Sequence, residues 1–133
     1  MAALLLAALL DAPAQAADVV VIVNKDNANP IDRALIINIY TGATRGWPDG
    51  TPVFALDQDD NSPVRTDFYA NVIGKSRAAM RAIWAQNISS GKGLPPKLAK
   101  PDAMIKKLVS GNKNAIGYIH ASSVDGSIKV VEQ

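Results

Sequence analysis

The strongest chemical signal in the sequence is a serine and an arginine at the predicted start of a helix. Ser62 precedes Pro63, and Arg65 follows three positions after the serine. A serine hydroxyl can cap free helical N–H groups, and proline at the first helical position loses no needed donor. A helix N-terminus also carries a partial positive charge of about half an elementary unit, which favours anions. The sequence therefore predicts an anion site formed by Ser62, the N–H groups of Val64 and Arg65, and the Arg65 guanidinium.

The same residues also have a purely structural interpretation. Ser62 would then only cap the helix, and Arg65 would pair with a nearby aspartate. Three aspartates, Asp57, Asp59 and Asp60, lie just ahead of the helix. Their negative charges oppose anion binding, because like charges at short range repel. The sequence leaves both interpretations open.

The acidic loop does not have the pattern of a calcium site. The spacing Asp57-x-Asp59-x-Asn61 resembles the start of a calcium loop. However, Ser62 and Phe68 stand where such a loop has glycine and glutamate. We therefore predict no bound metal ion.

Catalytic residue types are scarce. The chain has no cysteine, its single histidine is His120, and its single glutamate is Glu132 beside the C-terminus. No nucleophile–base pair or acid–base pair can be assembled from these residues. The sequence predicts a protein that is not an enzyme and that uses no cofactor.

The charges are divided unevenly along the chain. Residues 18–60 carry seven aspartates against three basic residues, whereas residues 61–133 carry eleven Lys and Arg against four acids. This excess in the second half suits an anionic ligand or partner, although a solvated surface explains it equally well. Nucleic-acid binding needs a denser basic stripe with aromatic residues, so we predict no nucleic-acid partner.

The N-terminus predicts export. Residues 1–10 are almost entirely Leu and Ala, and small residues follow at 12–17, as at a signal-peptide cleavage site. No Lys or Arg precedes the apolar run, which departs from the usual pattern. The run is too short for a transmembrane helix, which needs about 20 residues. We predict a signal peptide over residues 1–17, one domain over residues 18–133, and a periplasmic location.

Strands and helices alternate along the rest of the chain. Strands are predicted at 19–23, 52–56, 115–119 and 127–131, the last two separated by the turn dipeptide Asp125-Gly126. Helices are predicted between Asp32 and Gly42, from Pro63 to about Gly74, from Ser76 to a loop at 89–101, and over 103–109. This order predicts an α/β domain with a mostly parallel sheet covered by helices. Ligands of such sheets bind at the carboxyl ends of the strands.

Two of these helices have apolar residues at helical spacing. The third helix should pack through Met80, Ile83, Trp84 and Ile88. The fourth should direct Met104, Ile105 and Leu108 inward.

A series of short motifs resembles a known family. The motifs are Ile39-Tyr40-Thr41-Gly42, Trp47-Pro48-Asp49-Gly50, Arg65-x-x-Phe68, Val72-Ile73-Gly74-Lys75-Ser76, Trp84, Gly91-Lys92-Gly93 with Pro95-Pro96, and Ala115-Ile116-Gly117-Tyr118. Their order and spacing resemble the short, single-lobe relatives of phosphate ABC transporter substrate-binding proteins. The resemblance implies one lobe of a type II periplasmic-binding-protein fold, whose full-length members close two lobes on an oxyanion.

The resemblance also implies a ligand and partners. Full-length phosphate binders have a Gly-Ser-Gly-Thr-Arg-like stretch, and Asn61-Ser62-Pro63-Val64-Arg65 is the matching stretch here. Pro63 replaces a glycine and removes an N–H, and Val64 stands where a threonine hydroxyl is expected. Two functions remain open. One is capture of phosphate or a related oxyanion for an ABC permease. The other is a non-catalytic accessory role, in which the lobe docks onto a membrane sensor, a transporter or a second copy of itself.

Overall fold

The structure, a computed structural model, describes residues 18–131. The predicted signal peptide, residues 1–17, lies outside the described residues. The strands are β1 (Val19–Val23), β2 (Phe54–Asp57), β3 (Lys97–Leu98), β4 (Ala115–His120) and β5 (Lys129–Val131). The helices are α2 (Arg33–Thr41), α3 (Pro63–Phe68), α4 (Arg77–Ser89) and α5 (Asp102–Gly111), with a π-helical segment η3 (Tyr69–Ile73) and a 3-10 turn η4 (Ala121–Ser123).

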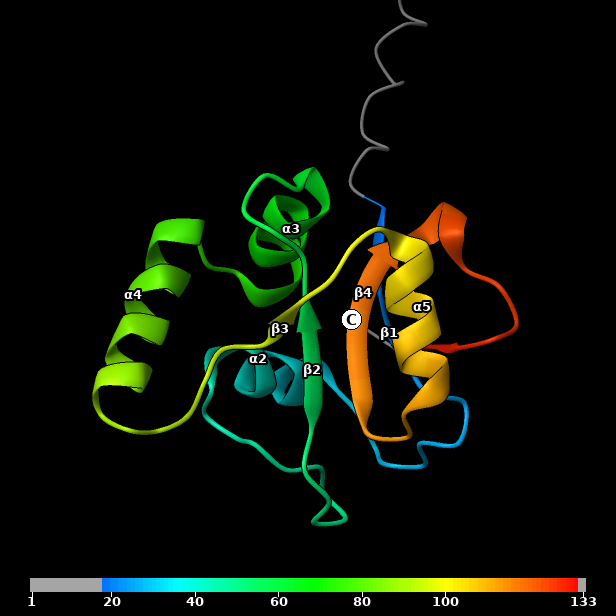
Figure 1. The fold of residues 1–133 in the computed structure, drawn as a ribbon, viewed down its shortest axis with the longest axis horizontal. Helices are drawn as coiled ribbons and strands as arrows, with labels where there is room; N and C mark the ends of the chain where they lie inside the picture. Colours follow the sequence, from blue (N-terminus) through cyan, green and yellow to red (C-terminus); the bar gives the residue numbers. More distant parts are fainter. Residues whose placement is uncertain (1–17, 132–133) are drawn as a thin grey trace, which may run out of the picture.

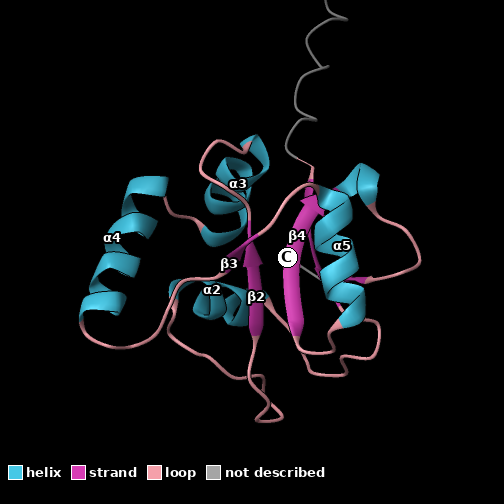
Figure 2. Ribbon diagram, in the orientation of Figure 1, coloured by secondary structure: helices cyan, strands magenta, loops and turns pink. Residues whose placement is uncertain are grey.

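The strands form one sheet in the order β3-β2-β4-β1-β5. Strand β2 pairs in parallel with β3 and β4, whereas β1 is antiparallel to both β4 and β5. Four strands therefore run in one direction and β1 runs in the other. Figure 2 shows β2 and β4 side by side and pointing the same way. The predicted α/β class with a mostly parallel sheet is confirmed. The last two strands are not paired, because β1 lies between them.

The sheet is buried on both faces. Along β1, Val21 and Val23 join one core cluster and Ile22 joins the other, as the alternation of strand side chains requires. The first cluster packs against α2, α3, η3 and α4, and the second packs beneath α5. In Figure 1, α4 and α5 accordingly lie at opposite sides of the molecule. This layering explains why β1 is a continuous apolar run.

Side-chain caps fix the helix starts that the sequence predicts. Asp32, Ser62 and Ser76 each accept a hydrogen bond from the backbone N–H three residues later. Gly42 and Gly74, with positive φ, end α2 and the α3–η3 helix. The predicted helix from Pro63 to Gly74 is thus confirmed as one helical run with a π-helical second half.

Three details differ from the sequence-based expectations. Ile88 is 49% exposed, because the end of α4 packs through Asn87, whose side chain bonds to the carbonyl of Thr41. Met104 is 42% exposed, because Ile105 faces the core from α5. The segment predicted as a loop at 89–101 contains the short edge strand β3, which pairs with β2.

Candidate functional site

A crevice lies at the ends of the neighbouring strands β2 and β3, where the polypeptide continues from each strand to a different face of the sheet. The loop after β2 leads to α3 on one face, and the loop after β3 leads to α5 on the other. Such a switch point is where open α/β sheets bind ligands. We call it the switch-point crevice; its volume is about 560 Å³. It is lined by Gln58, Asp59, Asn61, Ser62, Pro63, Val64, Lys100, Pro101, Asp102, Ala103 and His120.

The predicted site residues do not all face this crevice. Ser62 and Val64 line it, whereas Arg65 lines a different pocket beside α4. The Ser62 Oγ accepts a hydrogen bond from the Arg65 backbone N–H at 3.3 Å and donates one to Gln58 Oε1 at 2.8 Å. The Arg65 amide is therefore occupied by the cap. The predicted convergence of Ser62, two free amides and the guanidinium on one point is not seen.

Free backbone donors nevertheless line the crevice from two helices. Among the described residues, the amides of Val64, Asp102 and Ala103 have no hydrogen-bond acceptor. These amides belong to the first turns of α3 and α5, where helical N–H groups lack an intrahelical partner. Both helix N-termini bring a partial positive charge to the crevice. Sequence reasoning singled out the first of these helix starts and did not consider the second.

The charged side chains around the crevice are paired with one another. Lys100 Nζ lies 2.7 Å from Asp59 Oδ2, and His120 Nδ1 lies 2.9 Å from Asp102 Oδ2. The hydrogen bond from Lys100 lowers the pKa of Asp59. Burial acts to raise the pKa of Asp102, but hydrogen bonds from His120 and from Ser123 outweigh burial and lower it. With a neutral His120, Asp59 and Asp102 against Lys100 leave the crevice one net negative charge, and its free donors are backbone amides.

Asp102 should contribute to stability in a pH-dependent way. Because its folded-state pKa lies below that of the unfolded chain, its contribution is fully present above about pH 4 and is lost as the pH falls through the lowered pKa. We expect Asp102→Asn to lower the free energy of unfolding by about 1–3 kcal/mol at pH 7. The free energy of unfolding of this variant should also fall less steeply as the pH is lowered. Urea unfolding between pH 7 and pH 2 measures both. Asp59→Asn, at a more exposed ion pair, should cost clearly less than Asp102→Asn. Equal costs for the two variants would contradict this account.

Arg65 faces the acidic loop, as one of the two sequence interpretations proposed. Its Nη1 donates to the carbonyl of Gln58 at 2.6 Å and lies 3.4 Å from Asp60 Oδ1. Its Nε lies 3.9 Å from Asp57 Oδ1 and is buried without a hydrogen-bond partner. Burial acts to lower the pKa of Arg65, but the charge of Asp57, together with contributions from Tyr69, Tyr118 and Asp60, outweighs burial and raises it. The guanidinium also lies over the ring of Tyr69, 5.0 Å from its centroid.

Asp57 is a buried carboxylate that organises this region. It is 4% exposed and lies at the carboxyl end of β2. Tyr69 Oη donates to Asp57 Oδ2 at 2.6 Å, Tyr118 Oη donates to Oδ1, and the Gln58 amide donates to Oδ1 at 2.8 Å. Burial and the charge of Asp57 raise the pKa of both tyrosines, so they stay protonated donors. The sequence analysis missed this network, because its members are up to 61 residues apart.

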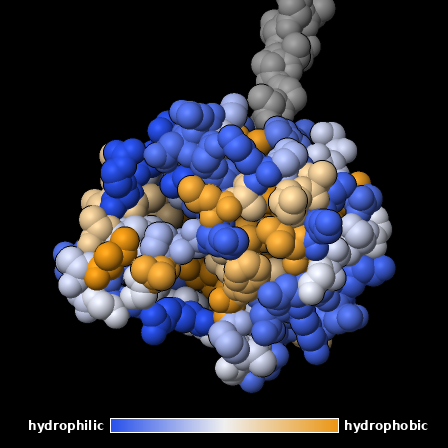
Figure 3. All heavy atoms as spheres, in the orientation of Figure 1, coloured by the Kyte–Doolittle hydropathy of each residue, from blue (hydrophilic) through white to orange (hydrophobic). Residues whose placement is uncertain are grey.

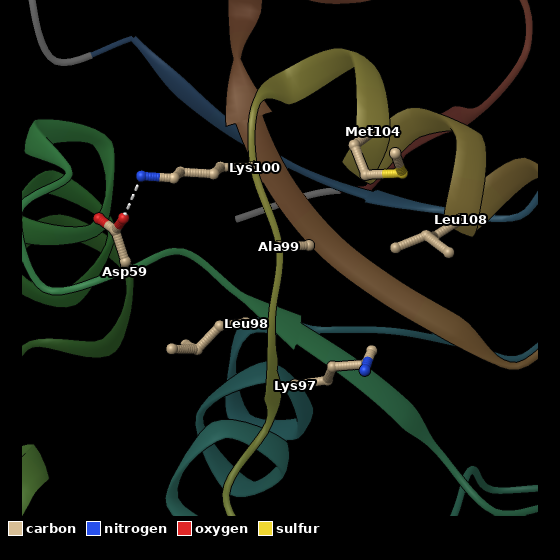
Figure 4. A pocket seen from close by; sticks show the side chains of 7 residues that line it. All are labelled: Asp59, Lys97, Leu98, Ala99, Lys100, Met104 and Leu108. Atoms are coloured by element: carbon tan, nitrogen blue, oxygen red, sulfur yellow. Dashed lines mark ion pairs between the residues drawn. The ribbon is translucent and has the colours of Figure 1, made fainter.

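An apolar groove of about 490 Å³ lies next to the crevice. Figure 4 shows its lining: Lys97, Leu98, Ala99, Lys100, Met104, Leu108 and Asp59. Leu98 is 56% exposed on the edge strand β3. On the face shown in Figure 3, apolar side chains gather near the middle and hydrophilic side chains surround them. We call this surface the β3–α5 groove.

Two features of the described residues bear on other classes of function. Within residues 18–131, no helix is both long enough and apolar enough to cross a membrane. The same part of the chain contains no group of three or more His, Cys, Asp or Glu side chains able to hold a metal ion.

Comparison with solved structures gives clear matches. The first is to a protein from Clostridium perfringens assigned as a phosphate ABC transporter substrate-binding protein and solved with bound phosphate. It is 27% identical, the match covers 86% of this chain and 44% of that one, and the TM-score is 0.68. An ABC-type phosphate transport receptor from Vibrio cholerae matches with 23% identity, coverage of 86% and 45%, and a TM-score of 0.65. PstS from Borrelia burgdorferi matches with 14% identity, coverage of 86% and 46%, and a TM-score of 0.61. No family model and no curated protein matches the sequence.

These matches confirm the resemblance that the motifs indicated. The fold is a single lobe of the type found in substrate-binding proteins of ABC transporters. Its similarity to one lobe of these substrate-binding proteins supports a relationship to the PBP-like superfamily. It spans less than half the length of each of the three matched proteins. Those proteins are named for substrate binding and transport, and none is named as an enzyme.

Proposed function

We propose that the protein is a periplasmic, non-enzymatic binding module that captures phosphate or a related small oxyanion in the switch-point crevice for an ABC permease. Residues 1–17 would serve as its signal peptide, and residues 18–133 would be the binding domain. The observation that carries the proposal is the meeting of two helix N-termini at the switch point, with the Val64, Asp102 and Ala103 amides free. The bound phosphate in the Clostridium perfringens protein supports the choice of anion.

In this proposal Ser62 supplies a side-chain donor beside the free amides. A hydroxyl carries one proton, and the Ser62 proton is directed to Gln58 in the structure. Anion binding would redirect that proton to the ligand, while the oxygen continues to cap α3. Arg65 acts only through Asp57 and Asp60 at this site, because its guanidinium faces away from the crevice.

Isothermal titration with phosphate and with sulfate tests the proposal. We expect saturable heat at millimolar phosphate or below, and we expect Ser62→Ala to weaken phosphate binding about 5- to 20-fold through loss of one hydrogen bond to a charged group. The matched control is Ser76→Ala, because Ser76 caps α4 in the same way but lies outside the crevice. Both variants should lose about 1 kcal/mol of stability.

Two results would contradict the proposal. One is the absence of heat with either anion for protein shown to be folded by circular dichroism. The other is equal phosphate affinity for the Ser62→Ala and Ser76→Ala variants, because Ser62 would then act only as a helix cap.

A second candidate function is self-association of the lobe through the β3–α5 groove. The chain spans less than half the length of its solved relatives, and a second copy could cover the open crevice. The exposed Leu98 and Met104 in the groove favour a protein contact there. Light scattering at two concentrations tests this candidate, with Leu98→Glu as the disruptive variant. A mass equal to one chain at both concentrations would exclude a dimer.

A further inference from the structure

A separate pocket of about 170 Å³ lies between α3–η3 and α4, on the other side of the loop that follows β2. We call it the arginine pocket. Its lining residues include Asp60, Arg65, Tyr69, Arg77, Arg81 and Trp84. Figure 1 shows α4 beside α3, with α4 at the opposite side of the molecule from α5. None of these residues lines the switch-point crevice.

Three guanidinium groups face this small space. Arg77 and Arg81 lie one turn apart on α4, and both are exposed. Neither forms an ion pair or a side-chain hydrogen bond with any described residue. Like charges at this helical spacing destabilise a helix by about 0.2–0.5 kcal/mol. Arg77 and Arg81 have no ion-pair partner in the described part of the chain, and they line the same pocket as a third arginine. Folding alone therefore does not explain why they lie together.

Arg65 presents a fixed side chain to the pocket. Its Nη1 is bonded to the Gln58 carbonyl, its Nε is buried near Asp57, and its plane lies over the ring of Tyr69. Its Nη2 makes no hydrogen bond within residues 18–131. Because the side chain is held by these contacts, binding a ligand would cost it little further rotational freedom.

The charge and size of the pocket indicate the kind of ligand. Three arginines against one carboxylate, Asp60, leave an excess of two positive charges. Arginine binds carboxylate and phosphate oxygens in a bidentate manner. A pocket of 170 Å³ is smaller than the roughly 300–1,000 Å³ of sites for drug-sized ligands, so it fits one anionic group. We propose that the arginine pocket binds a dianionic oxyanion, either free phosphate or the phosphate group of a phosphomonoester.

Trp84 gives the pocket a second property, an aromatic wall. Its indole Nε1 donates to the Tyr40 carbonyl at 2.9 Å, which fixes the ring in place. Tyr69 lies on the other helix of the pocket, under the Arg65 guanidinium. A phosphomonoester with an apolar or aromatic group could pack that group on the partly exposed Trp84 ring, whereas inorganic phosphate could not. The two sources of the same dianion can therefore be separated by affinity.

NMR titration of the ¹⁵N-labelled protein tests the proposal at constant ionic strength. The probes are inorganic phosphate, phenyl phosphate and, as a monoanion, acetate. We expect the Trp84 indole N–H signal to shift saturably with both phosphates and to shift little with acetate. The internal control is Trp47, whose indole bonds to the Asn114 carbonyl and which does not line the pocket. Tighter binding of phenyl phosphate would assign the ester as the ligand, and equal binding would assign free phosphate.

Variants with opposite expected effects complete the test. Arg77→Gln combined with Arg81→Gln should weaken phosphate binding at the Trp84 signal about tenfold or more, whereas Asp60→Asn should strengthen it several-fold. Lys107→Gln with Lys113→Gln removes the same charge from exposed positions outside the pocket and should change binding little. Ser62→Ala should not change the Trp84 titration, so this site and the switch-point crevice can fail independently.

Each phosphate is added first at 10-fold molar excess and then at millimolar concentration. The proposal is overturned if neither phosphate shifts the Trp84 signal under these conditions. It is also overturned if the double arginine variant and the double lysine variant bind alike, because general electrostatic attraction would then account for the binding.

Discussion

Replacement of Asp57 by alanine is expected to lower the free energy of unfolding by about 3–5 kcal/mol, the range observed when one partner of a buried charged pair is removed. The carboxylate is almost fully buried and accepts hydrogen bonds from Tyr69, Tyr118 and the Gln58 amide. Removing it would leave two tyrosine hydroxyls and the buried Arg65 Nε without their acidic neighbour. Buried donors that lose their acceptors carry the full cost of desolvation.

Two further variants separate the contribution of the buried hydrogen bonds to stability from the contribution of the negative charge. Asp57→Asn keeps the shape and one acceptor oxygen, so it should cost less than Asp57→Ala. Asp60→Ala also removes a carboxylate beside Arg65, but this side chain is 58% exposed and should cost about 1 kcal/mol or less. Urea unfolding with a constant m-value measures all three. Similar costs for Asp57→Ala and Asp60→Ala would show that the Asp57 network does not stabilise the fold.

The Asp57 network also marks the limit of what the sequence could predict. Local signals located the helix starts well, because a capping serine or aspartate acts within three residues of its partner. The same local logic singled out Ser62 and Val64, which line the switch-point crevice. It could not say where the Arg65 side chain points, because that depends on Asp57 and Tyr69.

The parts that sequence reasoning missed are contacts between distant segments. The start of α5 meets the start of α3 only because β3 pairs with β2, and β3 is two residues long. A strand that short has no detectable periodicity, so its segment was predicted as a loop. The arginine pocket was missed for a similar reason. Arg77 and Arg81 lie on α4, and only the position of α3 turns their side of this helix into the wall of a pocket.

Gly42 is the position where local and distant constraints meet. It ends α2 with a φ of +81°, a conformation that favours glycine. A Cβ there would lie 2.5 Å from Asn87 Nδ2 and 2.9 Å from Trp84 Cη2. Neither side chain is free to withdraw. The Trp84 indole donates to the Tyr40 carbonyl, and the Asn87 amide donates to the Thr41 carbonyl, so both satisfy carbonyl groups at the end of α2.

Gly42→Ala is therefore expected to lower the free energy of unfolding by about 2–5 kcal/mol, from the left-handed backbone and the added overpacking together. Gly74→Ala is the matched control. Gly74 also ends a helix, with a φ of +79°, but a Cβ there would meet nothing within 4 Å, so only the backbone cost of about 1–2 kcal/mol should remain. Denaturant unfolding gives the difference, and Trp84 fluorescence reports whether the indole has moved. Equal costs at the two glycines would mean that α4 can shift away from α2, and the arginine pocket, whose walls include Trp84, would then lose its fixed aromatic side.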